Sequence, residues 1–206
     1  MKTENSVIMG QAREALAGKW HLAVGTFFLY MIALISIQSI PKAGFLISLL
    51  ISGPMGLGAA IFSLSLSRNN NPHLEQIFEG FKRFGVALRA SLLVTLYTLL
   101  WALLLIVPGI IAGLGYSMTF YILADDDSIG AQDAMKKSKK MMDGSKWRLF
   151  FLGLRFFGWS LLAILTLGIG FLWLIPYMQV SLAKFYDDLK KGDAEGGSNV
   201  NLGHSI

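Results

Sequence analysis

The chain has 206 residues, of which 54% are hydrophobic and only 15% are charged, with a net charge of +5. Soluble domains carry about 25% charged residues. This composition therefore excludes an ordinary soluble protein and predicts an integral membrane protein, whose basic surplus suits an anionic membrane surface better than nucleic acid. The absence of cysteine from the sequence excludes disulfides, thiolate metal sites and a cysteine nucleophile.

Six segments are long and apolar enough to cross a bilayer, which takes about 20 residues in a helix. In chain order they are 20–39, 43–67, 84–107, 108–124, 147–167 and 168–186. Tight turns follow the first, third and fifth segments, so the spans are expected to form three hairpins. The prediction is an all-α integral membrane domain over residues 1–189. A polar tail over residues 190–206 is expected to be disordered, because its composition cannot bury a core.

The distribution of basic residues predicts the orientation of these spans. Placing both termini and both long loops in the cytoplasm leaves Lys42 as the one basic residue outside, among 18 Lys and Arg. Cytoplasmic loops carry an excess of Lys and Arg. We therefore expect a multi-pass protein with cytoplasmic N- and C-termini.

A short amphipathic helix is predicted on the cytoplasmic side before the first, third and fifth spans. Each carries apolar residues at helical spacing and a glycine, Gly18, Gly80 or Gly144, followed by basic and aromatic residues that suit the headgroup boundary. The pattern indicates three repeats of a surface helix and a hairpin, although any membrane hairpin needs such anchors. The apolar faces are Ile8, Ala12, Ala15 and Leu16; Leu74, Ile77, Phe78 and Phe81; and Ala131, Ala134, Met135, Ser138, Met141 and Met142.

Two arginines, Arg89 and Arg155, fall inside the third and fifth predicted spans. A charge at the bilayer centre costs about 2.5–3.5 kcal/mol even on a lenient scale, so the pair could bind a lipid phosphate or an anionic substrate. The alternative, which we favour, is that each side chain lifts its guanidinium to the headgroups from near the end of a span.

Four lysines, Lys136, Lys137, Lys139 and Lys140, project from the third amphipathic segment, whose opposite face is Ala and Met. They could hold anionic lipid, at about 1 kcal/mol per basic residue near the surface. The Met face could instead dock a partner protein, or the lysines could be an ordinary cytoplasmic anchor.

Glycine and proline interrupt several spans. Gly53-Pro54 and Pro176 could expose backbone groups to a substrate, but a packing kink is the commoner cause in membrane helices. Gly109 and Gly113 are spaced for close helix packing, within the chain or between protomers.

No catalytic, cofactor-binding or metal-binding constellation is present in the sequence. No Asp or Glu lies in a predicted span, which argues against a proton- or sodium-coupled carrier. Asp125-Asp126-Asp127 lacks the other ligands of a calcium loop, and we expect these acids to open the following helix, where negative charge is favourable. No cofactor and no enzymatic activity are expected.

Several runs resemble one family. They are Arg13-Glu14-Ala15-Leu16, Ile106-Val107-Pro108-Gly109-Ile110-Ile111, Tyr121-Ile122-Leu123-Ala124-Asp125, Ser138-Lys139-Lys140-Met141-Met142-Asp143-Gly144 and Thr166-Leu167-Gly168-Ile169-Gly170-Phe171-Leu172-Trp173. Together they resemble the bacterial membrane proteins of the domain of unknown function nine-seven-five, over about residues 7–189. More distantly, the hairpins are similar to the membrane domain of glycerophosphodiester phosphodiesterases. The resemblance implies a six-helix protein of the bacterial plasma (inner) membrane with no established activity.

The leading hypothesis is a non-enzymatic membrane module that binds anionic lipid, a membrane protein partner or a second copy of itself. The alternative is a transporter, channel or lipid scramblase, which the repeats, the interrupted helices and the two arginines favour. An enzyme acting on lipid is the weakest hypothesis, and nucleic acid is not an expected partner.

Overall fold

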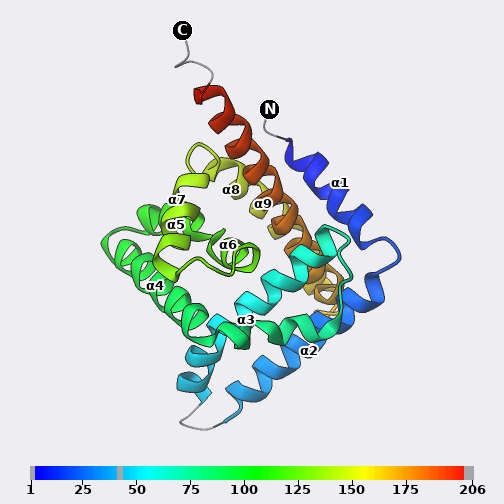
Figure 1. Ribbon diagram of the computed structural model, residues 1–206. Coiled ribbons are helices and arrows are strands. Elements are labelled where there is room, and N and C mark those ends of the chain that lie inside the picture. Colours follow the sequence, from blue (N-terminus) through cyan, green and yellow to red (C-terminus); the bar gives the residue numbers. More distant parts are fainter. Residues whose placement is uncertain (1–2, 41–43, 202–206) are drawn as a thin grey trace.

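The computed structural model describes residues 3–40 and 44–201, with side chains as far as Asp193, and all regular elements in this part of the chain are helices (Figure 1). In chain order they are α1 (Asn5–Leu16), α2 (Trp20–Gln38), α3 (Gly44–Ser67), the 3-10 helix η1 (Leu74–Arg83), α4 (Phe84–Leu104), α5 (Ile106–Tyr116), α6 (Thr119–Asp125), α7 (Ala131–Met141), α8 (Lys146–Leu165) and α9 (Phe171–Asn201).

Within the described part of the chain, five stretches are long and apolar enough to cross a membrane. They are Trp20–Gln38, Gly44–Ser67, Leu74–Leu104, Ile106–Asp125 and Lys146–Leu165. Large apolar side chains at their ends are exposed, such as Leu103 at 79% and Leu165 at 80%, and lipid is the solvent that suits such a surface. The fold is therefore all-helical with apolar membrane helices, as predicted.

The sixth predicted span, 168–186, is not among these stretches. It corresponds to the first half of α9, where Gln179, Lys184 and the following aspartates lower the mean hydropathy. The sixth crossing therefore stays a prediction. Helix α9 also continues to Asn201, into the segment whose composition predicts disorder, while residues 202–206 and Lys42 lie outside the described residues.

The fourth predicted span is divided into α5 and α6 by a turn at Ser117-Met118. The chain reverses before it at Leu105, and Pro108 lies in the first turn of α5. Proline is tolerated there because its missing N–H would have no partner within the helix. The third span accordingly ends at Leu104, three residues earlier than predicted.

Helices α3 and α9 lie side by side at the centre of the fold. Helix α3 contacts α2, α4, α6 and η1, and α9 contacts α1, α2 and α8. Buried residues of these helices join two hydrophobic clusters, one around Leu57 and Tyr186 and the other around Phe62 and Val180.

The apolar faces of α1 and α7 are buried within the protein. Ile8, Ala12 and Leu16 of α1 have no exposed surface, and α1 packs mainly on α9, where the Tyr177 hydroxyl donates to the Met9 carbonyl at 3.2 Å. Helix α7 packs mainly on α6, α4 and α5. The two helices are therefore parts of the core, with one polar side each.

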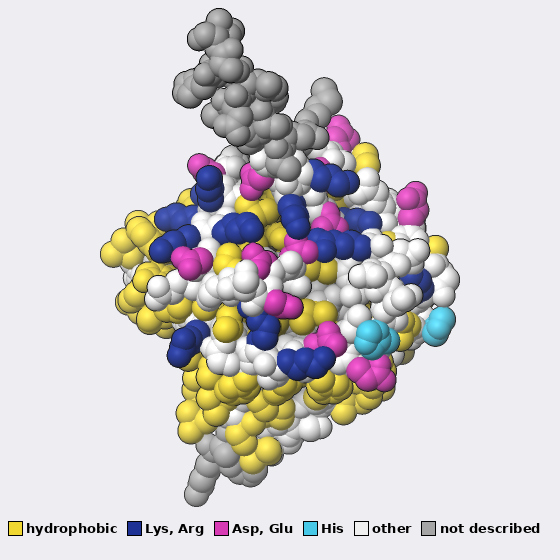
Figure 2. Space-filling view, viewed as in Figure 1, with side chains coloured by type: hydrophobic (Ala, Val, Ile, Leu, Met, Phe, Trp, Pro, Cys, Tyr) yellow, Lys and Arg dark blue, Asp and Glu magenta, His cyan; other side chains and the backbone are white. Residues whose placement is uncertain are grey.

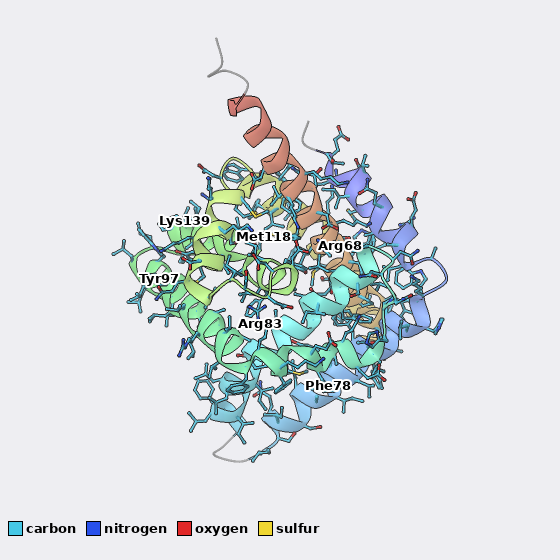
Figure 3. All side chains as sticks on the ribbon, viewed as in Figure 1. Arg68, Phe78, Arg83, Tyr97, Met118 and Lys139 are labelled. Carbon is cyan, nitrogen blue, oxygen red and sulfur yellow. The ribbon has the colours of Figure 1, made fainter. Side chains whose placement is uncertain are left out.

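The second amphipathic segment forms a 3-10 helix, η1, and not the predicted α-helix. With three residues per turn, positions three apart lie on one face, so Ile77 and Gly80 are buried while Phe78 and Phe81 are 50% and 37% exposed. The predicted apolar face is thus wrong for the two phenylalanines. Figure 3 shows Phe78 on the lower side of the molecule.

A backbone contact holds η1 to α3. A Cβ added to Gly58 would lie 1.8 Å from the Ile77 carbonyl oxygen, and one added to Gly80 would lie 1.9 Å from the Pro54 carbonyl oxygen. Glycine is the residue that allows two backbones to approach this closely. Gly53 similarly faces the backbone of Ala87 in α4, so Gly53-Pro54 is a packing site.

Candidate functional site

Charged side chains gather on one face of the molecule. Figure 2 shows Lys, Arg, Asp and Glu over the centre of this face, where Figure 1 places α6, α7 and the end of α3. Apolar side chains cover α4 on the left of the view and the α2–α3 hairpin at the bottom. Helix α7, which carries the predicted lysines, lies on this polar face.

Ser138 holds α7 in place at the turn between α5 and α6. Its hydroxyl donates to the Gly115 carbonyl at 2.8 Å and accepts the Met118 N–H at 3.2 Å. The turn leaves these two backbone groups without helical partners, and a buried backbone group needs a partner. Ser138 and Met118 have no exposed surface. The α5–α6 turn and the serine of α7 therefore form one joint.

This joint sets the direction of both faces of α7. Ala134, Met135 and Met141 are buried within the protein. The alternative that the Met face of α7 docks a partner protein is therefore wrong. All four lysines are exposed on the opposite side.

Two of these lysines line a cleft between α4, α5 and α7 with a volume of about 270 Å³, which we call the lysine cleft. Its lining residues are Leu93, Tyr97, Tyr116, Gln132, Met135, Lys136 and Lys139. The Tyr97 and Tyr116 rings lie 6.3 Å apart between centroids. The lining combines two ammonium groups, two phenol hydroxyls and an amide, which are all hydrogen-bond donors, and it contains no carboxylate.

An apolar groove of about 190 Å³ adjoins the lysine cleft and runs along α5. This α5 groove is lined by Trp101, Pro108, Ile111, Ala112, Gly115, Tyr116, Lys139 and Lys146. Lys139 and Tyr116 border both hollows. The Lys146 side chain lies over Gly115, because a Cβ added to Gly115 would be 3.8 Å from the Cε atom of Lys146. Cationic groups therefore stand at one end of an apolar surface, an arrangement that matches an anionic headgroup and its acyl chain.

The lysines differ in their partners. The Lys136 ammonium lies 3.6 Å from the Asp133 carboxylate, and the Lys146 ammonium lies 3.7 Å from the Asp143 carboxylate. In each pair the carboxylate is exposed and belongs to the residue three positions earlier in the chain. Such surface pairs contribute about 0–1 kcal/mol, so they leave the ammonium groups available. Lys139 has no ion pair within the described residues. Figure 3 shows Lys139 and Tyr97 on the same side of the molecule.

The other predicted site residues do not join the lysine cleft. Lys137 and Lys140 are exposed on α7 but do not line it. Arg89 of α4 and Arg155 of α8 are both exposed on apolar helices, and neither makes a hydrogen bond or ion pair with the described residues. The structure therefore does not bring the two arginines together, in keeping with side chains that extend along the outside of a span to the headgroups.

Sequence reasoning missed a charged network that ties α9 to α3 and α6. Arg68 donates to Asp125 at 2.5 Å and to Asp187 at 2.7 Å. Asp125 also accepts hydrogen bonds from the Tyr186 hydroxyl, at 3.0 Å, and from Lys190. The Asp125 side chain is only 10% exposed, and a carboxylate so enclosed requires partners of opposite charge. Asp125 closes α6, so its predicted role at the start of the next helix is wrong.

The other two acids of this run form the turn that follows α6. Asp126 accepts hydrogen bonds from the backbone N–H and the hydroxyl of Ser128, which closes a local turn. Arg83 of η1 reaches this turn and donates to the carbonyls of Leu123, at 2.5 Å, and Ile129, at 3.0 Å, and to Asp127. Helix α7 begins only at Ala131, after Gly130 as N-cap. Asp126 and Asp127 therefore make their contacts within this turn and do not cap α7.

A second charged pair joins α8, α9 and the N-terminus. Arg148 donates to Asp188 at 2.5 Å and lies 4.7 Å from the centre of the Phe185 ring. Burial alone disfavours the charged carboxylate of Asp188, but hydrogen bonds from Thr3 and Arg148 outweigh it and lower the pKa of Asp188. The polar face thus contains structural ion pairs. No group of three or more His, Asp or Glu side chains that could hold a metal ion occurs among the described residues.

Comparisons with known proteins match part of the chain to one family model and give no activity. No curated protein and no solved structure matches the chain. The matched stretch of the one family model runs from the end of α4 into α9, so it contains α7, its lysines and the joint at Ser138. Residues 103–193 match the family described as Protein of unknown function (DUF975), which supports the resemblance seen in the sequence.

Proposed function

We propose that the protein is a non-enzymatic membrane protein that binds an anionic phospholipid, with the headgroup in the lysine cleft and an acyl chain along the α5 groove. The observation that carries this proposal is the position of Lys139, which has no partner within the described residues and borders both hollows. Ammonium groups bind phosphate as point charges, and Tyr97, Tyr116 and Gln132 add neutral donors around it.

The charge of the cleft favours a lipid over a protein ligand. Each basic residue near an anionic membrane surface contributes about 1 kcal/mol, so Lys136 and Lys139 together favour the anionic lipid by about 2 kcal/mol, or about 30-fold in affinity. The apolar Met face of α7, which would suit a protein partner, is already buried. The interruption at Gly53-Pro54, which would suit a transporter, is packed against α4 and η1.

The proposal includes an orientation. We place the lysine cleft on the cytoplasmic side of a bacterial plasma membrane, with both termini on that side and six crossings in all. Support comes from the Lys and Arg side chains that gather on the polar face (Figure 2) and from the four lysines of α7, which lies between two predicted spans, because basic segments between spans remain inside.

The test uses two double variants of one helix that lose the same charge. Lys136→Gln/Lys139→Gln removes the cleft lysines, and Lys137→Gln/Lys140→Gln removes the two lysines outside the cleft. Binding of phosphatidylglycerol against phosphatidylcholine is measured by native mass spectrometry of the full chain. We expect the cleft variant to lose about 30-fold in preference for phosphatidylglycerol and the control to keep most of it. Equal losses in both variants would show a general surface charge and no site.

A further inference from the structure

A second groove, which shares no lining residue with the lysine cleft, lies where α1 and α2 meet α8 and α9. Its volume is about 360 Å³, within the range of about 300–1,000 Å³ that holds small ligands. We call it the Trp groove; residues that line it include Arg13, Trp20, Trp159, Leu162, Trp173 and Tyr177. The walls are almost entirely aromatic or aliphatic, so the groove suits a hydrocarbon chain.

Arg13 is the cation of this apolar groove. It lies on the exposed side of α1 and makes no ion pair or hydrogen bond with the described residues. A guanidinium presents a planar fork of donors that matches phosphate. The groove therefore offers a place for a hydrocarbon chain and an unpaired charge for an anionic headgroup.

The surroundings of Arg13 repeat those of Lys139. Gly18 follows α1 with φ +75° and Gly144 follows α7 with φ +67°, a backbone conformation that favours glycine. Arg13 precedes Gly18 by five residues, and Lys139 precedes Gly144 by five. When the two segments are aligned on Gly18 and Gly144, Arg13 of the Trp groove falls at the same position as Lys139 of the lysine cleft.

The burial of the two helices follows the same alignment. Positions ten, six and two residues before each glycine have no exposed surface. These pairs are Ile8 and Ala134, Ala12 and Ser138, and Leu16 and Met142. Helix α1 therefore presents the same face to α9 that α7 presents to α5 and α6.

The helices on which α1 and α7 pack, α9 and α5, also correspond in the spacing of their residues. Tyr177 follows Gly170 by seven residues, and Tyr116 follows Gly109 by seven. Each of these glycines packs on an alanine seven residues before it, with an added Cβ at 2.9 Å or less from the alanine backbone. The facing alanines are Ala163 and Ala102. Tyr177 and Tyr116 each line the groove of their own hairpin.

The third equivalent position is closed. Helix η1 lies on α3 with its backbone against that of α3, because Gly80 faces the Pro54 carbonyl. The residue seven after Gly44 is Ile51 and not a tyrosine. The α5 groove and the Trp groove therefore share a design that the residues described around η1 do not repeat.

From this correspondence we infer that the Trp groove is a second phospholipid site, with one acyl chain on its aromatic wall and the phosphate on Arg13. This inference rests on the proposed function of the lysine cleft, because it assigns the same ligand class to the matching groove. It predicts that one chain binds two phospholipids, one at each groove, and that each site can be removed without the other.

The test counts phosphatidylglycerol molecules retained by the full chain in native mass spectra. We expect two phosphatidylglycerol molecules on the parent protein and one on Arg13→Gln. In this variant the affinity of the Trp groove for the lipid should fall about tenfold, because a charged hydrogen bond is lost. Lys136→Gln/Lys139→Gln should also retain one, and the combined variant none. Leu162→Trp, which fills the groove without changing a charge, should act like Arg13→Gln. Arg155→Gln, a cation of α8 outside both grooves, is the control and should retain two.

The outcomes separate the two proposals. Two lipids on Arg13→Gln and on Leu162→Trp would overturn the Trp groove as a site. One lipid on the parent protein that only the lysine variant loses would do the same and leave the lysine cleft standing. Loss of a lipid from Arg13→Gln but not from the lysine variant would instead refute the lysine cleft. Displacement of the lipid by glycerol phosphate at equal concentration would contradict a role for the acyl chain.

Discussion

Replacing Ser138 by alanine tests whether the joint between α7 and the α5–α6 turn holds the lysine cleft in shape. The serine hydroxyl is the partner of the Gly115 carbonyl and the Met118 N–H. Alanine is a better helix former than serine, so any loss of stability comes from the two backbone groups and not from helix propensity.

The expected loss follows from the burial of those groups. A buried backbone donor or acceptor without a partner costs about 1–3 kcal/mol, and Ser138→Ala leaves one of each. We therefore expect the free energy of unfolding to fall by about 2–6 kcal/mol. This exceeds the average of about 0.6 kcal/mol for side-chain hydrogen bonds between membrane helices, because in this case the groups left unpaired are backbone groups at a break in the helix.

The assay is equilibrium unfolding of the purified protein in mixed micelles, followed by helical circular dichroism. Ser160→Ala is the control, since the Ser160 hydroxyl donates only within its own helix, to the Phe156 carbonyl at 2.9 Å, and its loss should cost no more than about 0.5 kcal/mol. Ser138→Ala should also weaken phosphatidylglycerol binding at the lysine cleft and leave the Trp groove unchanged. Equal stability of the two variants would refute the reasoning.

Three further predictions concern packing, pH and orientation. Gly58→Ala should destabilise the protein by about 1–3 kcal/mol or more, because its Cβ would overlap a backbone oxygen of η1; Gly56→Ala, whose Cβ would lie 3.7 Å from a phenylalanine ring, should be neutral or stabilising in the same unfolding assay. The folded pKa of Asp188 is lowered by its hydrogen bonds, so its contribution is complete above the unfolded pKa of about 4 and is lost as pH falls through the lower folded value; Asp188→Asn should abolish that part of the acid-induced loss of stability, and an unchanged pH profile would contradict it. Asn70→Cys should react with an impermeant thiol reagent only from the cytoplasmic side and Ile169→Cys only from outside, and the reverse labelling would overturn the proposed orientation.

Local patterns in the sequence predicted most of the helices. The starts of α2 and α4 coincide with predicted starts at Trp20 and Phe84, because each follows a basic residue and begins with an aromatic. The buried faces of α1 and α7 also followed from the spacing of apolar residues. The face of η1 did not, since the period of an apolar pattern decides which residues are buried and η1 has the shorter period of a 3-10 helix.

The candidate site was only partly predictable for a different reason. The run of lysines in α7 is visible in the sequence, but nothing local separates Lys136 and Lys139, which line the cleft, from Lys137 and Lys140. That distinction depends on which face of α7 Ser138 turns inward. The ion pair of Arg68 with Asp125 joins residues 57 apart, and a contact between such distant parts of the chain has no local signal.

The packing of α1 on α9 has a consequence for biosynthesis. Met9 and Tyr177, which join the two helices, are 168 residues apart. At a synthesis rate of about 5–20 residues per second, the ribosome needs about 10–30 s to make α9 after α1 has emerged. During that interval the apolar face of α1 has no protein to cover it, and an amphipathic helix in that position lies in the bilayer surface. We therefore expect the N-terminal helix to lie on the membrane surface until α9 has been made.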